Sequence, residues 1–156
     1  MNYLQFKQQF KEFVVFSLND IKKFDLAFDR RRLSEWQNRG YIKKIRRGYY
    51  IFSDDPLNES IMFLIANKIY SHSYISFESA LSYHQLIPES VFAVTSAVSK
   101  KTMTFETPIG VFLYRTIKIS LMFGYTLISY KNYKIKIAEP EKAILDYLYL
   151  HPDLVT

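Results

Sequence analysis

The chain contains no cysteine. It therefore has no disulfide bond and no thiolate for catalysis or metal binding, as is usual in the reducing cytoplasm. Its four glycines lie far apart in the sequence, so neither a P-loop nor a dinucleotide-binding fingerprint is present. No apolar run approaches the roughly 18 residues of a membrane-spanning helix, and Met1–Phe10 is too polar for a signal peptide. We therefore expect a cytoplasmic protein that does not associate with a membrane.

The charge of the chain is unevenly distributed. The 156 residues are 49% hydrophobic, enough for a folded core, and carry a net charge of +6. Residues 1–52 hold 12 Lys and Arg against 5 Asp and Glu, a balance of +7. Residues 53–156 hold 9 against 10, a balance of −1. A basic first third followed by a near-neutral remainder is typical of a nucleic-acid-binding domain joined to a second domain.

Two short helices are predicted inside the basic third. Ser17 and Asp20 form a Ser-x-x-Asp capping pattern, which predicts a helix over residues 18–24. Asp29 is expected to be the N-cap of a second helix, which places Leu33 and Trp36 inward. That helix is expected to stop at Gly40, because glycine readily takes the left-handed conformation that ends many helices. The pattern therefore predicts two helices joined by a short turn.

Strand-like segments follow these helices. Tyr41–Ile45 and Tyr49–Phe52 are expected to form a hairpin whose turn is Arg46-Arg47-Gly48. Before the helices, Asn2–Phe13 predicts a further helix with Leu4, Phe6, Phe10 and Phe13 on one stripe, and Val14-Val15-Phe16 can supply a third strand. Helices followed by a two-stranded ribbon predict a winged helix-turn-helix domain over residues 1–52.

The polar side of the second helix fits duplex DNA. With Leu33 facing inward, Arg31, Glu35 and Asn38 point outward on a helical wheel. Arginine can pair bidentately with guanine and asparagine with adenine, while basic residues of the hairpin can contact phosphates or enter a minor groove. The predicted DNA-binding residues are Arg30, Arg31, Arg32, Ser34, Glu35, Asn38, Arg39, Lys43, Lys44, Arg46 and Arg47. A solvated basic face without a ligand is the alternative interpretation.

A second domain is expected after a short polar connection over residues 53–58, so that the fold class is α+β. Within residues 59–156, Glu59–Tyr70 is apolar nearly all round and predicts a helix buried against a sheet. Ser76 is expected to cap the next helix, and Pro140 to open the last one, with Ala143, Ile144, Tyr147 and Leu148 on its inner side. The predicted strands are Val91–Val98, Met103–Thr107, Val111–Ile117, Tyr125–Tyr130 and Tyr133–Ala138.

Two motifs in the second domain resemble those of AbiE-type antitoxins, the type IV antitoxin family of phage-defence modules. Tyr74-Ile75-Ser76, Ser79-Ala80-Leu81 and His84 are similar to its Y-I-S-x-x-S-A-L-x-x-H pattern. Residues 138–146 are similar to its A-x-P-E-K-A-[IL]-L-D pattern, and Arg47-Gly48-Tyr49-Tyr50 to its R-G-x-Y. The resemblance covers about residues 5–150. The motif residues it marks are Ser76, Ser79, His84, Glu139, Pro140, Glu141, Lys142 and Asp146.

The resemblance implies an antitoxin that represses its own operon by binding the promoter and counteracts a nucleotidyltransferase-like toxin encoded beside it. It also implies a mixed α/β antitoxin domain over residues 59–156. This chain ends soon after its second motif, whereas relatives usually continue with further helices. From the residues themselves, the motif serines suit caps and tight packing, and Glu141 with Lys142 suit the helix dipole and a surface ion pair.

Two other functions remain open at this stage. The chain could be a protein-interaction module that blocks a partner directly, without specific DNA binding. It could also be a small metal-dependent nuclease, if Glu78, Glu139, Glu141 and Asp146 converge in space. The three histidines stand apart from one another, with no partner at metal-ligand spacing. We therefore expect no enzyme activity, no metal and no cofactor.

Overall fold

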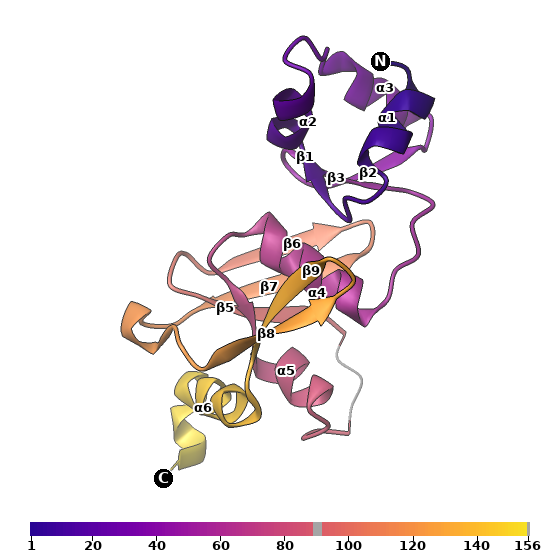
Figure 1. The fold of residues 1–156 in the computed structure, drawn as a ribbon. Coiled ribbons are helices and arrows are strands. Elements are labelled where there is room, and N and C mark those ends of the chain that lie inside the picture. Colours follow the sequence, from indigo (N-terminus) through magenta and orange to yellow (C-terminus); the bar gives the residue numbers. More distant parts are fainter. Residues whose placement is uncertain (89–91, 156) are drawn as a thin grey trace. The chain divides into compact units, whose positions relative to one another are not determined.

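The computed structural model describes residues 1–88 and 92–155. Its helices and strands divide between two compact units, Met1–Leu57 with Thr107–Ile109, and Asn58–Glu106 with Gly110–Thr156 (Figure 1). Among the described residues there are six α-helices and two β-sheets, which confirms the α+β class. The division after Leu57 falls at the polar connection over residues 53–58.

Helices and strands interleave in the first unit. They are α1 (Tyr3–Phe10), β1 (Phe16–Ser17), α2 (Leu18–Phe24), α3 (Arg31–Asn38), β2 (Ile42–Arg46) and β3 (Tyr49–Phe52). The strands form an antiparallel sheet in the order β1-β3-β2, with Phe16 opposite Tyr50 and Ile42 opposite Phe52. The bounds predicted for α2 and β3 are confirmed, and β1 is the third strand expected near Phe16.

Helix caps account for two of these boundaries. The Ser17 hydroxyl accepts a hydrogen bond from the Asp20 backbone N–H, and the Asp20 carboxylate accepts one from the Ser17 N–H, which confirms the predicted capping pattern. The predicted N-cap at Asp29 is wrong by one residue. Arg30 holds the N-cap position of α3 in a helical conformation, and the Asp29 carboxylate accepts from the Arg31 N–H instead. Gly40, at φ +77°, follows the end of α3 as expected.

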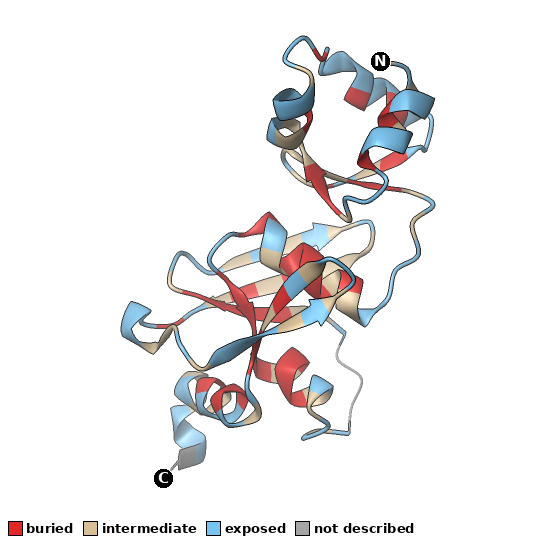
Figure 2. Ribbon diagram, viewed as in Figure 1, coloured by how far each residue is buried: buried red, intermediate tan, exposed pale blue. Residues whose placement is uncertain are grey.

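One aromatic core holds the first unit together. Phe6 contacts the rings of Phe10, Phe16, Phe28, Trp36 and Phe52, at centroid distances between 4.6 and 5.9 Å. These rings come from both helices and strands, so all elements of the unit share one interior (Figure 2). The inward stripe predicted for α1 is wrong at Leu4, which is 76% exposed, and at Phe13, which lies beyond the end of the helix and is 38% exposed. Tyr3 packs against the core instead, because the stripe of the helix is centred on Phe6 and Phe10.

A six-stranded sheet forms the centre of the second unit. Its order is β6-β7-β5-β4-β9-β8, and two neighbouring pairs, β4 with β9 and β5 with β7, are parallel. The strands are β4 (Tyr74–Ile75), β5 (Val94–Val98), β6 (Met103–Thr107), β7 (Gly110–Thr116), β8 (Tyr125–Tyr130) and β9 (Tyr133–Ala138). The bounds of β8 and β9 agree with the prediction. Strand β5 begins at Val94, and the predicted start at Val91 lies outside the described residues.

Helices cover both faces of this sheet. Helix α4 (Glu59–Ile69) lies on one face, and α5 (Phe77–Tyr83) and α6 (Pro140–Leu150) lie on the other (Figure 1). Short 3-10 helices follow at Ile119–Leu121 (η1) and Pro152–Val155 (η2). Six residues of α4 are buried, among them Phe63 and Ile65, which confirms that it is a core helix. No helix in the part of the chain that the structure describes has the length and apolar character to cross a membrane.

The inner side of α6 differs from the prediction. The buried residues are Lys142, Ala143 and Asp146, whereas Ile144 is 43% exposed. An apolar pattern alone places Ile144 inward, but the helix is rotated so that a charged pair enters the interior. The partners of that pair come from elsewhere in the sequence, as described below.

Candidate functional site

The polar residues predicted for α3 lie on its exposed face. Leu33 and Trp36 are 3% and 4% exposed and fix the inner side of the helix. The residues predicted around the outer side are all exposed, namely Arg30, Arg31, Arg32, Ser34, Glu35, Asn38 and Arg39. The helical wheel therefore sorted inner from outer positions correctly.

Several of these arginines already have partners within the chain. Arg31 makes a bidentate pair with Asp29, with Nη2 at 2.7 Å and Nε at 3.0 Å from Oδ2. Hydrogen bonds from the guanidinium and backbone of Arg31 lower the pKa of Asp29 to about 2. Arg39 lies 3.4 Å from Glu35, and Arg32 donates to the Met1 carbonyl. Each of these contacts is exposed, so water or another anion can replace it at small cost.

Other predicted residues of α3 and its N-cap have side chains without such contacts. Among the described residues, Arg30, Ser34 and Asn38 make no side-chain hydrogen bond or ion pair with the rest of the chain. Glu35, which could orient Arg31 or Arg39 by the sequence alone, pairs with Arg39. Asn38 is therefore the base-reading candidate that is most readily available to a ligand.

The basic hairpin is short. Lys44 and Arg47 are exposed, whereas Lys43 and Arg46 are partly buried. The turn contains Gly48 at φ +86°, and the Gly48 carbonyl accepts a hydrogen bond from the Leu18 N–H at 3.3 Å. The tip is thus tied to the start of α2, and Arg47 is its exposed basic residue.

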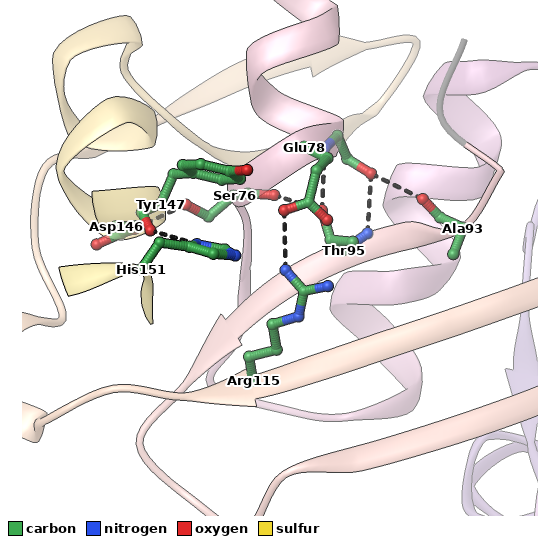
Figure 3. A network of polar contacts seen from close by, with 9 residues as sticks. Ser76, Glu78, Ala93, Thr95, Arg115, Asp146, Tyr147 and His151 are labelled. Atoms are coloured by element: carbon green, nitrogen blue, oxygen red, sulfur yellow. Dashed lines mark hydrogen bonds and ion pairs between the residues drawn. The ribbon is translucent and has the colours of Figure 1, made fainter. Parts of the chain in front are cut away.

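Three of the predicted motif residues, Ser76, Lys142 and Asp146, meet in a buried polar network, and Figure 3 shows its Ser76–Asp146 contact. The Tyr74 and Ser76 hydroxyls both donate to Asp146 Oδ2 at 2.7 Å. The Lys142 ammonium lies 2.8 Å from Oδ1. The side chains of Lys142 and Asp146 are only 6% and 2% exposed, so the predicted surface ion pair at Lys142 is wrong. Glu141, its neighbour, is exposed.

Gly124 makes room for the buried lysine. A Cβ at this position would lie 2.8 Å from Lys142 Cγ, closer than side-chain carbons approach in folded proteins. The Lys142 ammonium lies 4.7 Å from the Phe123 ring centroid, a distance suited to a cation–π contact. The Gly124 carbonyl also accepts from the Glu139 N–H at the start of α6. The loop before β8 therefore encloses the charged pair.

The remaining motif residues join α5 to the sheet. Ser79 and Thr95 are linked twice, because each backbone N–H donates to the other's hydroxyl, at 2.9 and 2.8 Å (Figure 3). Ser76 holds the N-cap position of α5, but the predicted capping bond is absent since its hydroxyl donates to Asp146. His84 Nε2 lies 2.8 Å from the Ala138 carbonyl. The two motifs, about 60 residues apart in the chain, therefore meet in space.

Tyr74 and Asp146 are both buried, which sets the protonation of Tyr74 and the access to Asp146. Burial and the neighbouring Asp146 carboxylate raise the pKa of Tyr74 well above its usual value, so its hydroxyl remains a hydrogen-bond donor. Asp146 accepts from three donors and is 1% exposed, which leaves no access for a substrate. The network joins α6 to β4 and to the start of α5. Glu139 is the N-cap of α6 and Pro140 is its first residue.

The carboxylates considered for a nuclease do not converge. Glu78 pairs with Arg115 at 2.9 Å, whereas Asp146 is occupied by its own donors. Glu139 and Glu141 are exposed on α6. Within residues 1–88 and 92–155, no cluster of three or more His, Asp or Glu is arranged to hold a metal ion.

Sequence reasoning missed several members of the network. Tyr74 belongs to the first motif but was not singled out as a site residue, and Gly124 carried only the weak signal of an isolated glycine. Thr95 lies in a β-branched run that indicates only a strand.

Comparison with family models and with curated proteins finds no match for this chain.

Proposed function

We propose that this protein is a DNA-binding transcriptional regulator that contacts duplex DNA through its first unit. The observation that carries the proposal is the placement of α3 and the β2–β3 hairpin on one core with their polar and basic residues outward. The element order of the unit, with its antiparallel β1-β3-β2 sheet, supports an interpretation as a winged helix-turn-helix. In that interpretation α3 is the recognition helix.

The contacts divide by role in this proposal. Asn38 reads base edges, because its amide is exposed and unpaired and can pair bidentately with adenine. Lys44 and Arg47 neutralise phosphates, since the short tied hairpin cannot extend deep into a groove. Arg31 reaches DNA by exchanging the Asp29 carboxylate for a phosphate or a guanine edge. The exposed pair makes this exchange inexpensive.

We further propose, on the resemblance to AbiE-type antitoxins, that the protein represses its own operon in the cytoplasm and counteracts a nucleotidyltransferase-like toxin. Two motifs of that family meet in the second unit at Ser76 and Asp146, and His84 and Ala138 are also joined. Their meeting supports a common structural core for the resemblance. The antitoxic role is then assigned to surfaces of the second unit.

A protein-interaction module is the second candidate. The pairing of Arg31 with Asp29 and of Arg39 with Glu35 favours it, because arginines that already hold carboxylates are less available to pair with base edges. In that case the first unit would recognise an acidic protein surface without base readout.

Duplex affinity separates these two functions. We expect the full chain to bind its own promoter duplex more tightly than a random duplex in fluorescence anisotropy. Asn38→Ala should weaken the binding free energy for the promoter duplex by about 1–3 kcal/mol. It should also reduce the difference in affinity between the promoter duplex and the random duplex. Arg47→Ala should weaken both duplexes alike and reduce the log K against log salt slope by about 0.9. Lys11→Ala, a matched loss of charge outside α3 and the hairpin, is the control.

Equal affinity for the two duplexes, unchanged by Asn38→Ala, would favour the interaction module. The antitoxic role is tested by co-expression with the toxin encoded beside the gene. Rescue of growth by a double Asn38→Ala, Arg47→Ala variant would place that role in the second unit. Loss of rescue by this variant would mean that protection arises from repression instead.

A further inference from the structure

A cavity of about 350 Å³ lies in the second unit, apart from α3 and the hairpin. Its wall comes from the segment before β4, the end of β5, the 3-10 helix η1, and strands β8 and β9. The lining residues that matter here are His72, Tyr74, Lys100, Ile119, Tyr125 and Lys136. The size is at the lower end of the roughly 300–1,000 Å³ typical of small-molecule sites.

The charge around this cavity has one sign. Lys100 and Lys136 line it, and none of its described lining residues is acidic. The Lys136 ammonium makes no hydrogen bond or ion pair with any described residue. The Lys100 ammonium has only a 3.4 Å contact with the Ser71 hydroxyl and the face of Tyr70. Both ammonium groups are therefore available to an anion.

The rest of the cavity wall is aromatic and apolar. Tyr125 stacks on Tyr74, with centroids 4.9 Å apart and planes 22° from parallel. Tyr74 is buried and its hydroxyl donates to Asp146, so it holds the ring of Tyr125, which is 38% exposed. Ile119 and Met122 add apolar surface. A fixed aromatic pair beside cationic groups suits a ligand that combines a flat ring with a negative charge.

The backbone beside the cavity is also unusual. His72 has φ +61°, a left-handed conformation that is uncommon outside glycine. Strain of this kind persists where the surrounding structure enforces it and often accompanies ligand sites. His72 is exposed, so its imidazole is accessible as a further hydrogen-bond donor to an anion.

We propose that this cavity binds a small phosphorylated ligand of the nucleotide class, with its phosphates at Lys100 and Lys136 and its ring against Tyr125, which the buried Tyr74 supports from behind. Lysine binds phosphate as a point charge through charge-assisted hydrogen bonds. The proposal is independent of DNA binding, because every lining residue belongs to the second unit.

Isothermal titration calorimetry of the full chain with ATP tests the site. Lys136→Ala should raise the Kd for ATP about tenfold or more, the usual scale for loss of one hydrogen bond to a charged group. Lys134→Ala is the matched control, since Lys134 lies on the same strand, donates to the Ser129 hydroxyl and does not line the cavity. It should change the Kd less than about twofold on the same scale.

Further ligands separate the phosphate from the ring. Adenosine and pyrophosphate should each bind at least about tenfold more weakly than ATP, because each offers only one of the two features. Pyrophosphate binding as tight as ATP would overturn the aromatic part, and adenosine binding as tight would overturn the role of the lysines. No ATP binding at millimolar concentration, or binding lost in Arg47→Ala but kept in Lys136→Ala, would overturn the site altogether.

Discussion

In the first unit, charged side chains lie on the surface and pair locally, as Arg31 does with Asp29. In the second unit, the Lys142–Asp146 pair is enclosed and saturated with hydrogen bonds. An exposed pair stabilises a fold by about 1 kcal/mol at most, and it can be exchanged for a ligand. A buried pair cannot be opened without leaving an uncompensated charge. The charges of the first unit are therefore exchangeable, whereas those of the second unit are fixed.

The largest expected effect is at Asp146. Asp146→Ala leaves the buried Lys142 ammonium without its carboxylate and removes the acceptor of two hydroxyls. The free energy of unfolding should fall by about 3–5 kcal/mol, as measured by urea denaturation of the full chain. Glu141→Ala, an exposed change in the same helix, should cost about 1 kcal/mol or less. A similar small cost at Asp146 would contradict the architectural role of the pair.

A glycine in each unit allows the open first unit and the enclosed Lys142 site of the second unit to be compared. Gly48→Ala in the first unit meets no atom within 4 Å and suffers only from its φ of +86°, at a cost of about 1–2 kcal/mol. Gly124→Ala has a φ of +79° and also drives Cβ into Lys142, which adds a further cost of about 1–3 kcal/mol. In thermal unfolding, the melting temperature of Gly124→Ala should therefore be well below that of Gly48→Ala. Equal melting temperatures would show that Lys142 can move aside.

A third test uses pH. Tyr74→Phe removes one hydrogen bond to a carboxylate and should cost about 1.5–3 kcal/mol at pH 7. Because the pKa of Tyr74 is raised in the folded state, its contribution is fully present below the unfolded pKa of about 10 and is lost as pH rises beyond it. The wild type should therefore lose up to about 1.4 kcal/mol more per pH unit above pH 10 than Tyr74→Phe. Parallel pH profiles would contradict the raised pKa.

The smallest expected change in stability is at Asp29. Asp29→Asn breaks only an exposed pair, so the urea midpoint should hardly move. If α3 binds DNA, the variant frees the Arg31 guanidinium and removes a negative charge. Anisotropy titrations should then give tighter duplex binding and a salt slope about 0.9 steeper. Since the pKa of Asp29 is about 2, this pair does not make DNA affinity depend on pH between 5 and 9. Weaker binding by Asp29→Asn would indicate that Asp29 positions Arg31 for its ligand.

The sequence by itself determined the local elements of this protein. The bounds of α2 follow from Ser17 and Asp20, since a capping box needs only residues three positions apart. The β8–β9 hairpin follows from two alternating runs on either side of Lys131-Asn132. The exposed side of α3 follows from Leu33 and Trp36 at helical spacing. In each case the residues that decide the structure are neighbours in the chain.

Only the tertiary structure decided the place of the charged pair in α6. Lysine and aspartate four residues apart in a helix look like a surface pair, and nothing nearby in the sequence says otherwise. The pair becomes buried because Tyr74 and Ser76, some 70 residues earlier, supply hydrogen bonds, and because Gly124 leaves space for the lysine. Desolvation of a charge depends on every group that surrounds it, and these groups come together only when the chain has folded.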